Sequence, residues 1–284
     1  MGIGRTYTSQ IIPGTARLMQ RRHADIMAIA KQAGRVGVEE LAAHFAVTPQ
    51  TIRRDLNDLS SAGVLTRVHG GAMIASGIQN VGYEARRLVA QTQKQLIGEA
   101  AAELIADHSS LFMNIGTTTE EVGRALVGRT GLLIITNNLH VANLLYKSPG
   151  IEVIVAGGSI RSGDGGIMGE SAVSLIKQFK VDTAVIGTSA IDAGGTLLDF
   201  DIREVQASRT IIEHARRVIL VADSSKFSRS APACVAHLSS IDVLVTDRLT
   251  SLQMELCRTY GVEVIEVGGP EEPDAGPVSI EPFS

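Results

Sequence analysis

One segment, residues 47–72 (VTPQTIRRDLNDLSSAGVLTRVHGGA), constrains the fold more than any other part of the chain. Thr48 is a typical helix N-cap residue and Pro49 suits the first helical position, so we expect a helix to begin here. Three apolar residues then recur at helical spacing and indicate one buried face: Ile52, Leu56 and Leu59. The segment therefore predicts a capped amphipathic helix that packs on a core.

The elements around this helix predict a small helical unit with a hairpin. Two helices are expected before it, an amphipathic one over residues 21–33 and a shorter one over 38–45. The turn that follows them is short, and Ala46 stands where a helix-turn-helix often has glycine. Residues 64–69 alternate with strand period up to a pair of glycines, which indicates a β-hairpin. Three helices and a hairpin in this order predict a winged helix-turn-helix.

The polar face of the third helix carries side chains that can hydrogen-bond base edges or pair with phosphates. A solvated surface helix would explain an isolated pair of arginines, but the order of the surrounding elements favours DNA binding. The candidate DNA-binding residues are Thr48, Gln50, Thr51, Arg53, Arg54 and Asn57 on the helix, and Arg67 and His69 on the wing.

Charge is distributed unevenly along the chain. Residues 1–75 hold nine Lys and Arg against five Asp and Glu, a net +4, whereas the whole chain is at −4, which leaves −8 for residues 76–284. Only the N-terminal part suits a polyanion. Because +4 is modest, we expect two such units to bind double-stranded operator DNA together, in a homodimer or homotetramer.

Composition excludes several other classes of protein. With 284 residues and 44% hydrophobic content, the chain can form a large core and a small second domain. It has no run of 18 apolar residues and no leader with a cleavage site, so we expect a cytoplasmic protein that does not contact membranes. Neither Cys234 nor Cys257 has a partner at a metal-binding spacing, and the histidines are scattered. We therefore expect no metal site, no disulfide and no cofactor.

Beyond residue 90, short apolar runs alternate with helical patterns, and the runs are apolar on both faces, as in a mostly parallel sheet covered by helices. The expected strands are 111–115, 132–136, 153–156, 183–187, 218–222, 243–246 and 262–267. The expected organisation is a disordered extension (1–19), the winged helix-turn-helix (20–75), a linker (76–90), an α/β sensor domain (91–268) and a disordered tail (269–284).

Ligands of open α/β sheets bind at the carboxyl ends of the strands, so the loops there hold the candidate binding residues. The segment NIGTTT at 114–119 combines a glycine, hydroxyls and a helix start, which suits a phosphate, although a simple N-cap cluster would look the same. The amides of TNN at 136–138 could fix hydroxyl groups. The candidates from these two loops are Asn114, Gly116, Thr117, Thr118, Thr119, Thr136, Asn137 and Asn138.

A third loop contains Gly157, Gly158 and Arg161. A pair of glycines is commonly only a turn, and Arg161 could be a surface residue as readily as a cation that binds phosphate. This loop therefore adds three candidates whose role the sequence leaves open.

The fourth loop, 192–204, brings Asp199, Asp201 and Glu204 to the start of a helix. The helix dipole alone would explain one or two acids there, but three carboxylates could also accept hydrogen bonds from a polyol. Lys226, just past the next strand, could offset their charge or bind the phosphate, although lone lysines are usually solvated. These four residues complete the candidate effector-binding set.

Taken together, these motifs resemble the DeoR family of bacterial transcriptional regulators over about residues 20–268. The resemblance is carried by PQTIRRDLNDL, RVHGGA, IGTTT, TNN, AGGSIRS, LLDFDIRE and ADSSKF. It implies a repressor whose sensor domain is similar to the ribose-5-phosphate isomerase fold. It also implies that a phosphorylated polyol or sugar, with glycerol 3-phosphate favoured, relieves repression. The chain departs from the family at Asn114, where an aspartate is common.

Two alternatives remain from the sequence: a regulator of another phosphosugar, and a sugar-phosphate isomerase fused to a DNA-binding domain. Isomerisation would need a carboxylate base with an acid or lysine partner in one pocket. The GGTLL segment at 194–198 lacks the lysine that isomerases of that fold carry in a comparable loop. We therefore expect no enzymatic activity and assign no catalytic residues.

Overall fold

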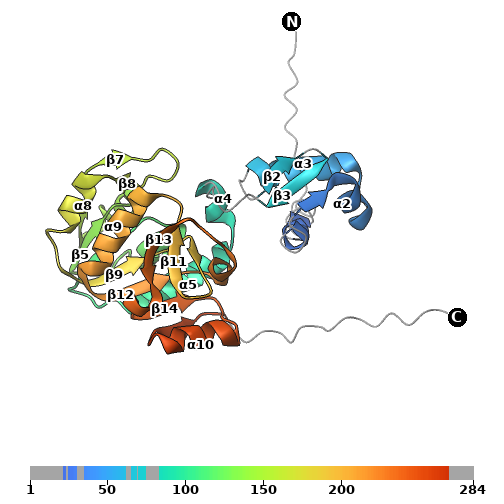
Figure 1. The fold of residues 1–284 in the computed structure, drawn as a ribbon. Coiled ribbons are helices and arrows are strands. Elements are labelled where there is room, and N and C mark those ends of the chain that lie inside the picture. The colour runs from blue at the N-terminus through green and yellow to red at the C-terminus, as the bar shows by residue number, and fades with distance from the viewer. Residues whose placement is uncertain are drawn as a thin grey trace, which may run out of the picture. The chain divides into compact units, whose positions relative to one another are not determined.

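The computed structural model describes residues 22–23, 25–30, 35–61, 65–68, 70–74 and 83–268. The chain divides into two compact units, Met1–Ala85 and Arg86–Ser284 (Figure 1). The extension expected at 1–19 and the tail expected at 269–284 lie outside the described residues. None of the described helices is long and apolar enough to span a membrane.

The N-terminal unit contains the predicted helices and hairpin. Residues 22–23 and 25–30 are helical, and they precede β1 (Arg35–Gly37), α2 (Val38–His44), α3 (Pro49–Ser61), β2 (Leu65–Val68) and β3 (Gly71–Ile74). The three strands form an antiparallel sheet in the order β1-β3-β2, of which the sequence predicted only the hairpin. Gly70 has a φ of 76° in the hairpin turn, a conformation that favours glycine. The helix-turn-helix with a wing is confirmed.

The turn between α2 and α3 is a helix-ending motif with an unusual residue. The amide of Val47 donates to the carbonyl of Ala42 at 3.1 Å, and the amide of Ala46 donates to that of Ala43 at 3.3 Å. This pair of bonds satisfies the last carbonyls of α2 and places Ala46 in the left-handed region, with a φ of 50°. Because a Cβ is disfavoured there, this turn stores conformational strain.

An ion pair fixes α3 to the helical residues before β1. Asp55 is only 2% exposed, and its carboxylate accepts hydrogen bonds from Arg22 at 2.6 and 3.0 Å. His23 lies 3.1 Å from the same carboxylate. Asp55 is therefore a buried structural residue.

Seven strands of the C-terminal unit form one parallel sheet, as predicted. They are β4 (Ser110–Met113), β5 (Leu132–Thr136), β6 (Ile151–Val155), β9 (Val181–Ile186), β12 (Ala215–Val221), β14 (Val243–Thr246) and β15 (Glu263–Glu266). Their order is β15-β14-β12-β9-β4-β5-β6, and every neighbouring pair is parallel. The strand order therefore reverses between β4 and β9.

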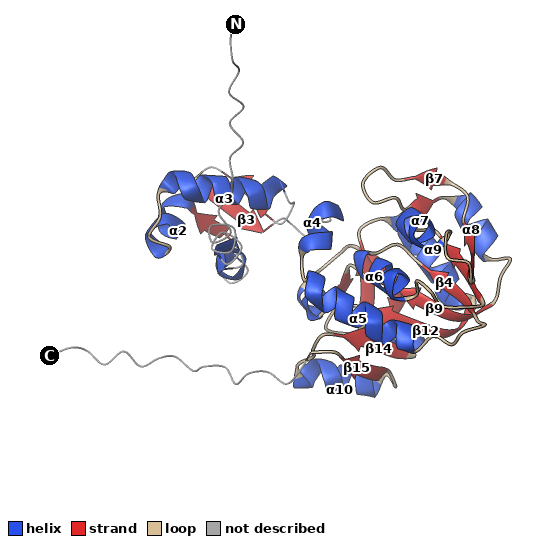
Figure 2. Ribbon diagram, turned by 180° about the vertical axis from the view of Figure 1, so that it is seen from behind, coloured by secondary structure: helices blue, strands red, loops and turns tan. Residues whose placement is uncertain are grey.

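Helices cover both faces of this sheet (Figure 2). One face packs against α5 (Gln91–Glu103), α6 (Thr117–Ala125) and α7 (Leu139–Leu145). The other packs against α8 (Glu170–Ile176), α9 (Ile202–Glu213) and α10 (Ser251–Thr259). In β4, Leu111 and Met113 belong to the first core and Phe112 to the second, and all three are fully buried. Strands buried on both faces explain the continuous apolar runs of the sequence.

Short antiparallel elements surround the main sheet. β10 (Ala190–Ile191), β11 (Thr196–Asp199) and β13 (Ala233–His237) form a three-stranded sheet, and β7 (Ser159–Ile160) pairs with β8 (Ile167–Met168). The interpretation of 192–204 as a loop is therefore wrong for β11. That strand is held on both sides by β10 and β13. Because β13 follows β11 by more than 30 residues, this pairing cannot be recognised from the residues of β11 alone.

The segment expected as a linker, 76–90, is not uniformly irregular. It contains α4 (Tyr83–Leu88), which carries Arg86. The guanidinium of Arg86 donates to Asp164 at 3.1 Å, and the ammonium of Lys94 donates to the Arg86 carbonyl. These polar contacts hold the end of α4 on the C-terminal unit.

Candidate functional site

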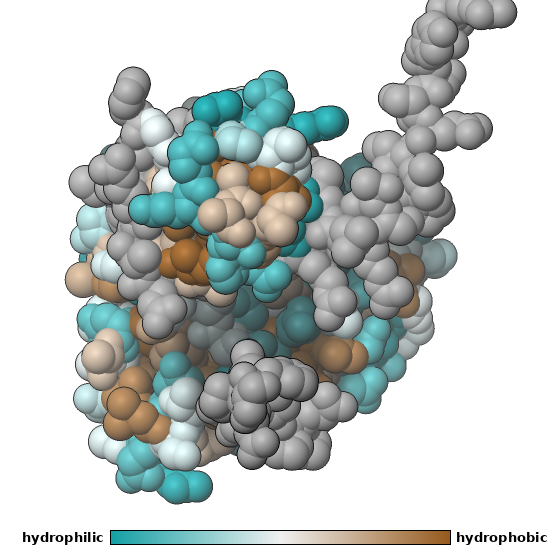
Figure 3. All heavy atoms as spheres, turned by 90° about the vertical axis from the view of Figure 1, so that its right-hand side faces the viewer, coloured by the Kyte–Doolittle hydropathy of each residue, from teal (hydrophilic) through white to brown (hydrophobic). Residues whose placement is uncertain are grey.

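The N-terminus of α3 presents an exposed polar surface. Five of the predicted DNA-binding residues on this helix are exposed, and Thr51 is half-buried. Thr48 accepts a hydrogen bond from the Thr51 amide at 3.2 Å, so its hydroxyl caps the helix. Arg53 lies 3.4 Å from Glu39 in an exposed pair that a phosphate can replace. The face of this unit seen in Figure 3 is mainly hydrophilic around a small apolar area.

The two wing residues are less well defined. Arg67 lies in β2 and pairs with Ala72 of β3. The structure describes the backbone of Arg67 but not its side chain. His69 lies outside the described residues altogether. Their contribution to DNA binding therefore stays a prediction.

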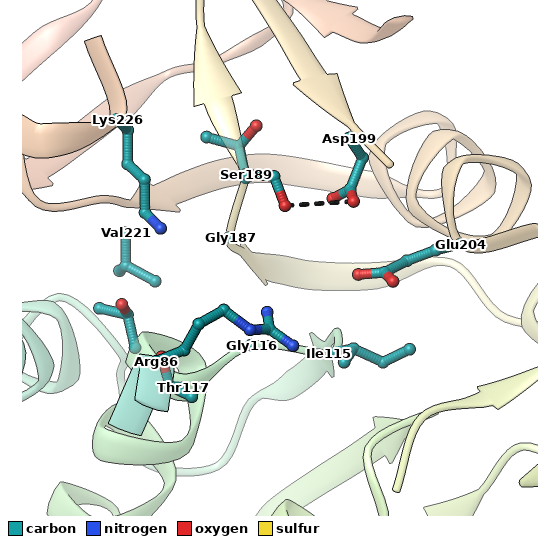
Figure 4. A pocket seen from close by; sticks show the side chains of 12 residues that line it. Arg86, Ile115, Gly116, Thr117, Gly187, Ser189, Asp199, Glu204, Val221 and Lys226 are labelled. Atoms are coloured by element: carbon teal, nitrogen blue, oxygen red, sulfur yellow. Dashed lines mark hydrogen bonds between the residues drawn. The ribbon is translucent and has the colours of Figure 1, made fainter. Parts of the chain in front are cut away.

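A pocket lies at the carboxyl ends of β4, β9 and β12, where the strand order reverses (Figure 4). This is the position at which open α/β sheets bind ligands. The pocket and its open mouth enclose about 360 Å³. Six of its lining residues were predicted from the sequence: Gly116, Thr117, Thr118, Asp199, Glu204 and Lys226. Six others were not: Arg86, Ile115, Gly187, Thr188, Ser189 and Val221.

The N-terminus of α6 forms one wall of the pocket. The helix begins at Thr117, and no side chain caps it. Its first amides have no partner within the helix, and they carry the positive end of the helix dipole. Thr119, in contrast, uses its hydroxyl to bind the carbonyls of Asn114 and Gly116, at 3.0 and 2.7 Å. The amides of this turn, rather than the Thr119 hydroxyl, are available to an anion.

Positive side chains lie beside this helix terminus. Lys226 belongs to the short 3-10 helix η1 (Ser224–Ser228), and burial lowers its pKa to about 7. The buried carboxylate of Asp223 opposes this shift, and repulsion from Arg229 and Lys94 adds to it. Burial likewise lowers the pKa of Lys94 to about 8. Arg86 has a buried Nε atom with no hydrogen-bond partner among the described residues. The accumulated positive charge and the unpaired donor suit an anionic ligand.

The opposite wall is acidic. Asp199 and Glu204 are 6% and 7% exposed, and both carboxylates point toward the space between the lining residues (Figure 4). Burial raises the pKa of both groups, and the charge of Asp199 raises that of Glu204 further, to about 7. Ser189 donates to Asp199 at 3.2 Å. This wall supplies acceptors for hydroxyl groups.

Arg161 does not line the pocket. Its guanidinium lies 2.5 Å from Asp164, 3.1 Å from Asp201 and 2.7 Å from Glu204. The predicted role as a phosphate ligand is not supported, because these carboxylates already occupy its donors. Arg161 instead forms an ion pair with Glu204 outside the pocket and so compensates part of the charge of the acidic wall.

The remaining predicted residues lie outside the pocket, and the asparagines among them have structural roles. Asn114 accepts from the Gly187 amide at 3.0 Å and donates to Ser208 at 3.3 Å, which fixes the loop after β9. Asn138 caps α7. The residues that the sequence assigned to the effector but that do not line the pocket are Asn114, Thr119, Thr136, Asn137, Asn138, Gly157, Gly158, Arg161 and Asp201.

Arg86 is the lining residue that the sequence was least able to reveal. It lies in a stretch that carries no sustained period, and its contacts come from distant segments. Gly187, Thr188 and Ser189 directly follow a predicted strand, so the rule that ligands bind at strand ends could have found them. Within the described residues, no group of His, Cys, Asp or Glu could hold a metal ion.

A winged helix-turn-helix joined to an α/β unit with a polar pocket at its strand ends is the architecture of a DNA-binding regulator with a small-molecule sensor. The family models agree: "DeoR-like helix-turn-helix domain" matches residues 22–77, and "DeoR C terminal sensor domain" matches residues 89–248. The chain belongs to the DeoR family and is a DNA-binding transcriptional repressor with a sugar-sensor domain, not an enzyme.

Named relatives are similar over most of their length. The chain is 44% identical to the glycerol-3-phosphate regulon repressor of Escherichia coli, over 84% of this chain and 98% of that protein. It is 46% identical to the protein of the same name from Haemophilus influenzae, over 79% and 88%. Among solved structures, ribose 5-phosphate isomerase from Methanocaldococcus jannaschii matches with a TM-score of 0.37 and 15% identity, over 49% of this chain and 55% of that one.

Proposed function

We propose that a phosphorylated polyol or sugar binds the pocket at the β4 and β9 strand ends and releases this repressor from its operator. Glycerol 3-phosphate is the favoured effector. The observation that carries the proposal is the division of the pocket: the α6 N-terminus, Arg86 and Lys226 supply positive charge, and Asp199 and Glu204 supply hydroxyl acceptors. A small molecule with a phosphate at one end and hydroxyls at the other matches both walls.

The names of two relatives support this choice of effector, because both are glycerol-3-phosphate regulon repressors at 44% and 46% identity. The volume of about 360 Å³ includes open solvent at the mouth, so it does not separate a three-carbon phosphate from a larger phosphosugar. A regulator of another phosphosugar is therefore the second candidate. The choice of glycerol 3-phosphate rests on the relatives, whereas the inference that the effector carries a phosphate rests on the pocket.

For the DNA-binding half, we propose that α3 inserts its N-terminal residues into the major groove of an operator half-site, in the cytoplasm. The amino acids on the exposed face, among them Gln50, Arg53 and Asn57, are types that bind base edges and phosphates. A modest net charge of +4 over residues 1–75 favours binding as a homodimer or homotetramer on paired half-sites.

Release requires that the effector bind the low-affinity state better than the operator-bound state. A difference of about 3 kcal/mol between the two affinities would lower operator affinity about a hundredfold. The coupling free energy that the proposal needs lies within the range of about 1–3 kcal/mol that is typical of allosteric proteins.

The test is a titration of glycerol 3-phosphate into the repressor bound to a labelled operator fragment, followed by fluorescence anisotropy. We expect release at concentrations where glycerol and inorganic phosphate have no effect. A matched variant, Lys226→Ala, should need much more effector while binding the operator normally. If glycerol 3-phosphate releases no more DNA than inorganic phosphate does, the assignment of this effector is wrong, and a panel of phosphosugars tests the second candidate.

A further inference from the structure

The charged side chains that line the pocket fall on two sides, and each side has a counter-charge nearby: the buried Asp223 acts on Lys226, and Arg86 acts on Asp199. Lys226 and Arg86 lie on one side of the space, and Asp199 and Glu204 lie on the other (Figure 4). A phosphate that binds the positive side therefore directs the rest of the ligand toward two buried carboxylates. Any group on that second end must be compatible with negative charge.

Each carboxylate keeps one oxygen for a ligand. Oδ1 of Asp199 accepts from Ser189 at 3.2 Å and from the Phe200 amide at 2.6 Å. Oε2 of Glu204 accepts from Arg161 at 2.7 Å. No other described residue donates to Oδ2 of Asp199 or Oε1 of Glu204. The two remaining oxygens can therefore accept hydrogen bonds from hydroxyl groups of a ligand.

The acidic wall has little spare positive charge. Arg161 is the cation nearest to Glu204, and its guanidinium is already shared with Asp164 and Asp201. The hydroxyl of Thr188 lies 2.9 and 3.0 Å from the carbonyls of Ala190 and Leu198, which take up its single proton, so no proton is left for an anion. A carboxylate or second phosphate placed here would meet like charges, because Arg86, the other cation that acts on Asp199, is engaged by the first phosphate in the proposed binding mode.

We propose that Asp199 and Glu204 exclude ligands with a second anionic group, so that the effector carries a single phosphate and an uncharged hydroxylated end. This inference rests on the proposed function, since it assumes that the phosphate binds at the α6 N-terminus. It assigns the two acids a role in specificity as well as in affinity: they separate phosphorylated polyols and sugars from phosphorylated acids and bisphosphates of the same size.

The test compares two ligands that differ at one carbon. Racemic glycerol 3-phosphate and racemic 3-phosphoglycerate share the phosphate and the central hydroxyl, but a carboxylate replaces the terminal CH₂OH in the second. Isothermal titration calorimetry on the full chain gives the ratio of their dissociation constants, and it is done at about pH 8 because burial raises the pKa of Glu204 to about 7 and the carboxyl must be ionised. We expect the acid to bind at least about thirtyfold more weakly, the effect of a like charge in a partly buried site.

Two variants and a control locate the cause. In Asp199→Asn and Glu204→Gln, which keep the shape of each side chain, the ratio should fall to about threefold or less, because one like charge is gone. Asp107→Asn removes a surface charge that pairs with Arg129 and contacts no pocket residue, so its ratio should equal that of the wild type. Thermal unfolding checks that each variant is folded.

Comparable affinity of the wild type for both ligands would overturn the inference, as would a ratio unchanged in both pocket variants. If glycerol 3-phosphate does not bind, the proposed effector fails by itself, and the comparison is made with glucose 6-phosphate and 6-phosphogluconate. Discrimination within that pair would support the inference. If neither pair binds, the proposed function and the inference both fail.

Discussion

Nη2 of Arg86 donates to Oδ2 of Asp164 at 3.1 Å, which joins a lining residue of the pocket to the β7–β8 hairpin loop. The same carboxylate accepts from Arg161. Asp164 therefore competes with any ligand anion for the Arg86 guanidinium. The competition matters because a phosphate gains less from a cation that is already paired.

The first prediction follows from this contact. Asp164→Asn should raise the affinity for the effector by about three- to tenfold, because Arg86 is then no longer neutralised by a carboxylate. Asparagine retains an oxygen that can accept from the Gly166 amide, at 3.2 Å in the wild type, so the loop should keep its conformation. Calorimetry measures the affinity, and Asp107→Asn, which disrupts a remote surface pair with Arg129, is the matched control. Unchanged or weaker binding would mean that Arg86 does not bind the phosphate.

Effector binding should depend on pH through Lys226. Its pKa is lowered to about 7 in the free protein, whereas a bound phosphate dianion would raise it. Between about pH 7 and 8.5 the free lysine loses its proton and the complex retains one, so binding takes up a proton and weakens on the order of tenfold as pH rises.

Lys226→Arg provides the matched variant for this pH dependence. The guanidinium stays charged across the range, so the affinity should fall less between about pH 7 and 8.5 than it does in the wild type. Lys94 and Glu204, with pKa values of about 8 and about 7, titrate in this range in both proteins and account for the dependence that remains. Calorimetry in two buffers with different ionisation enthalpies counts the protons taken up. Equal pH dependence in the wild type and the variant would exclude Lys226 as the titrating group.

The recognition helix makes a prediction that is independent of the pocket. Replacing Arg53 or Arg54 by alanine should weaken operator binding by about 1–3 kcal/mol, and an arginine that binds only phosphate should also lower the salt dependence by about one unit. Anisotropy titrations at several salt concentrations give both quantities. Effector binding should be unchanged, and Arg258→Ala, an exposed change on α10, should affect neither. Wild-type operator affinity in both alanine variants would contradict this role.

The turn before the recognition helix allows a stability test. Ala46 has a φ of 50°, so Ala46→Gly should stabilise the N-terminal unit by about 0.5–1 kcal/mol, since glycine adopts this conformation without strain. Ala43→Gly, three residues earlier within α2, should destabilise it by about the same amount. Unfolding of the full chain in guanidinium chloride, followed by circular dichroism, shows whether each substitution raises or lowers the free energy of unfolding. A destabilised Ala46→Gly protein would show that the turn is not strained.

Much of the fold could be predicted because its signals are local. The seven strands of the main sheet are apolar on both faces, and α3 combines an N-cap, Pro49 and a helical apolar period. The binding site could be predicted only in part. Gly116, Thr117 and Thr118 follow a strand and open a helix, which is a local pattern. Arg86 has no such pattern and enters the site through α4.

The sequence by itself determined the elements, their alternation and the segments that could bind DNA or a phosphate, because capping, periodicity and turn residues act over a few positions. Only the tertiary structure decided which polar residues share the pocket. Arg161 pairs with three carboxylates, Asn114 fixes the loop after β9, and Arg86 lines the site instead. The reason is that the strand order reverses between β4 and β9, so residues about 30 to 140 positions apart meet at one edge of the sheet.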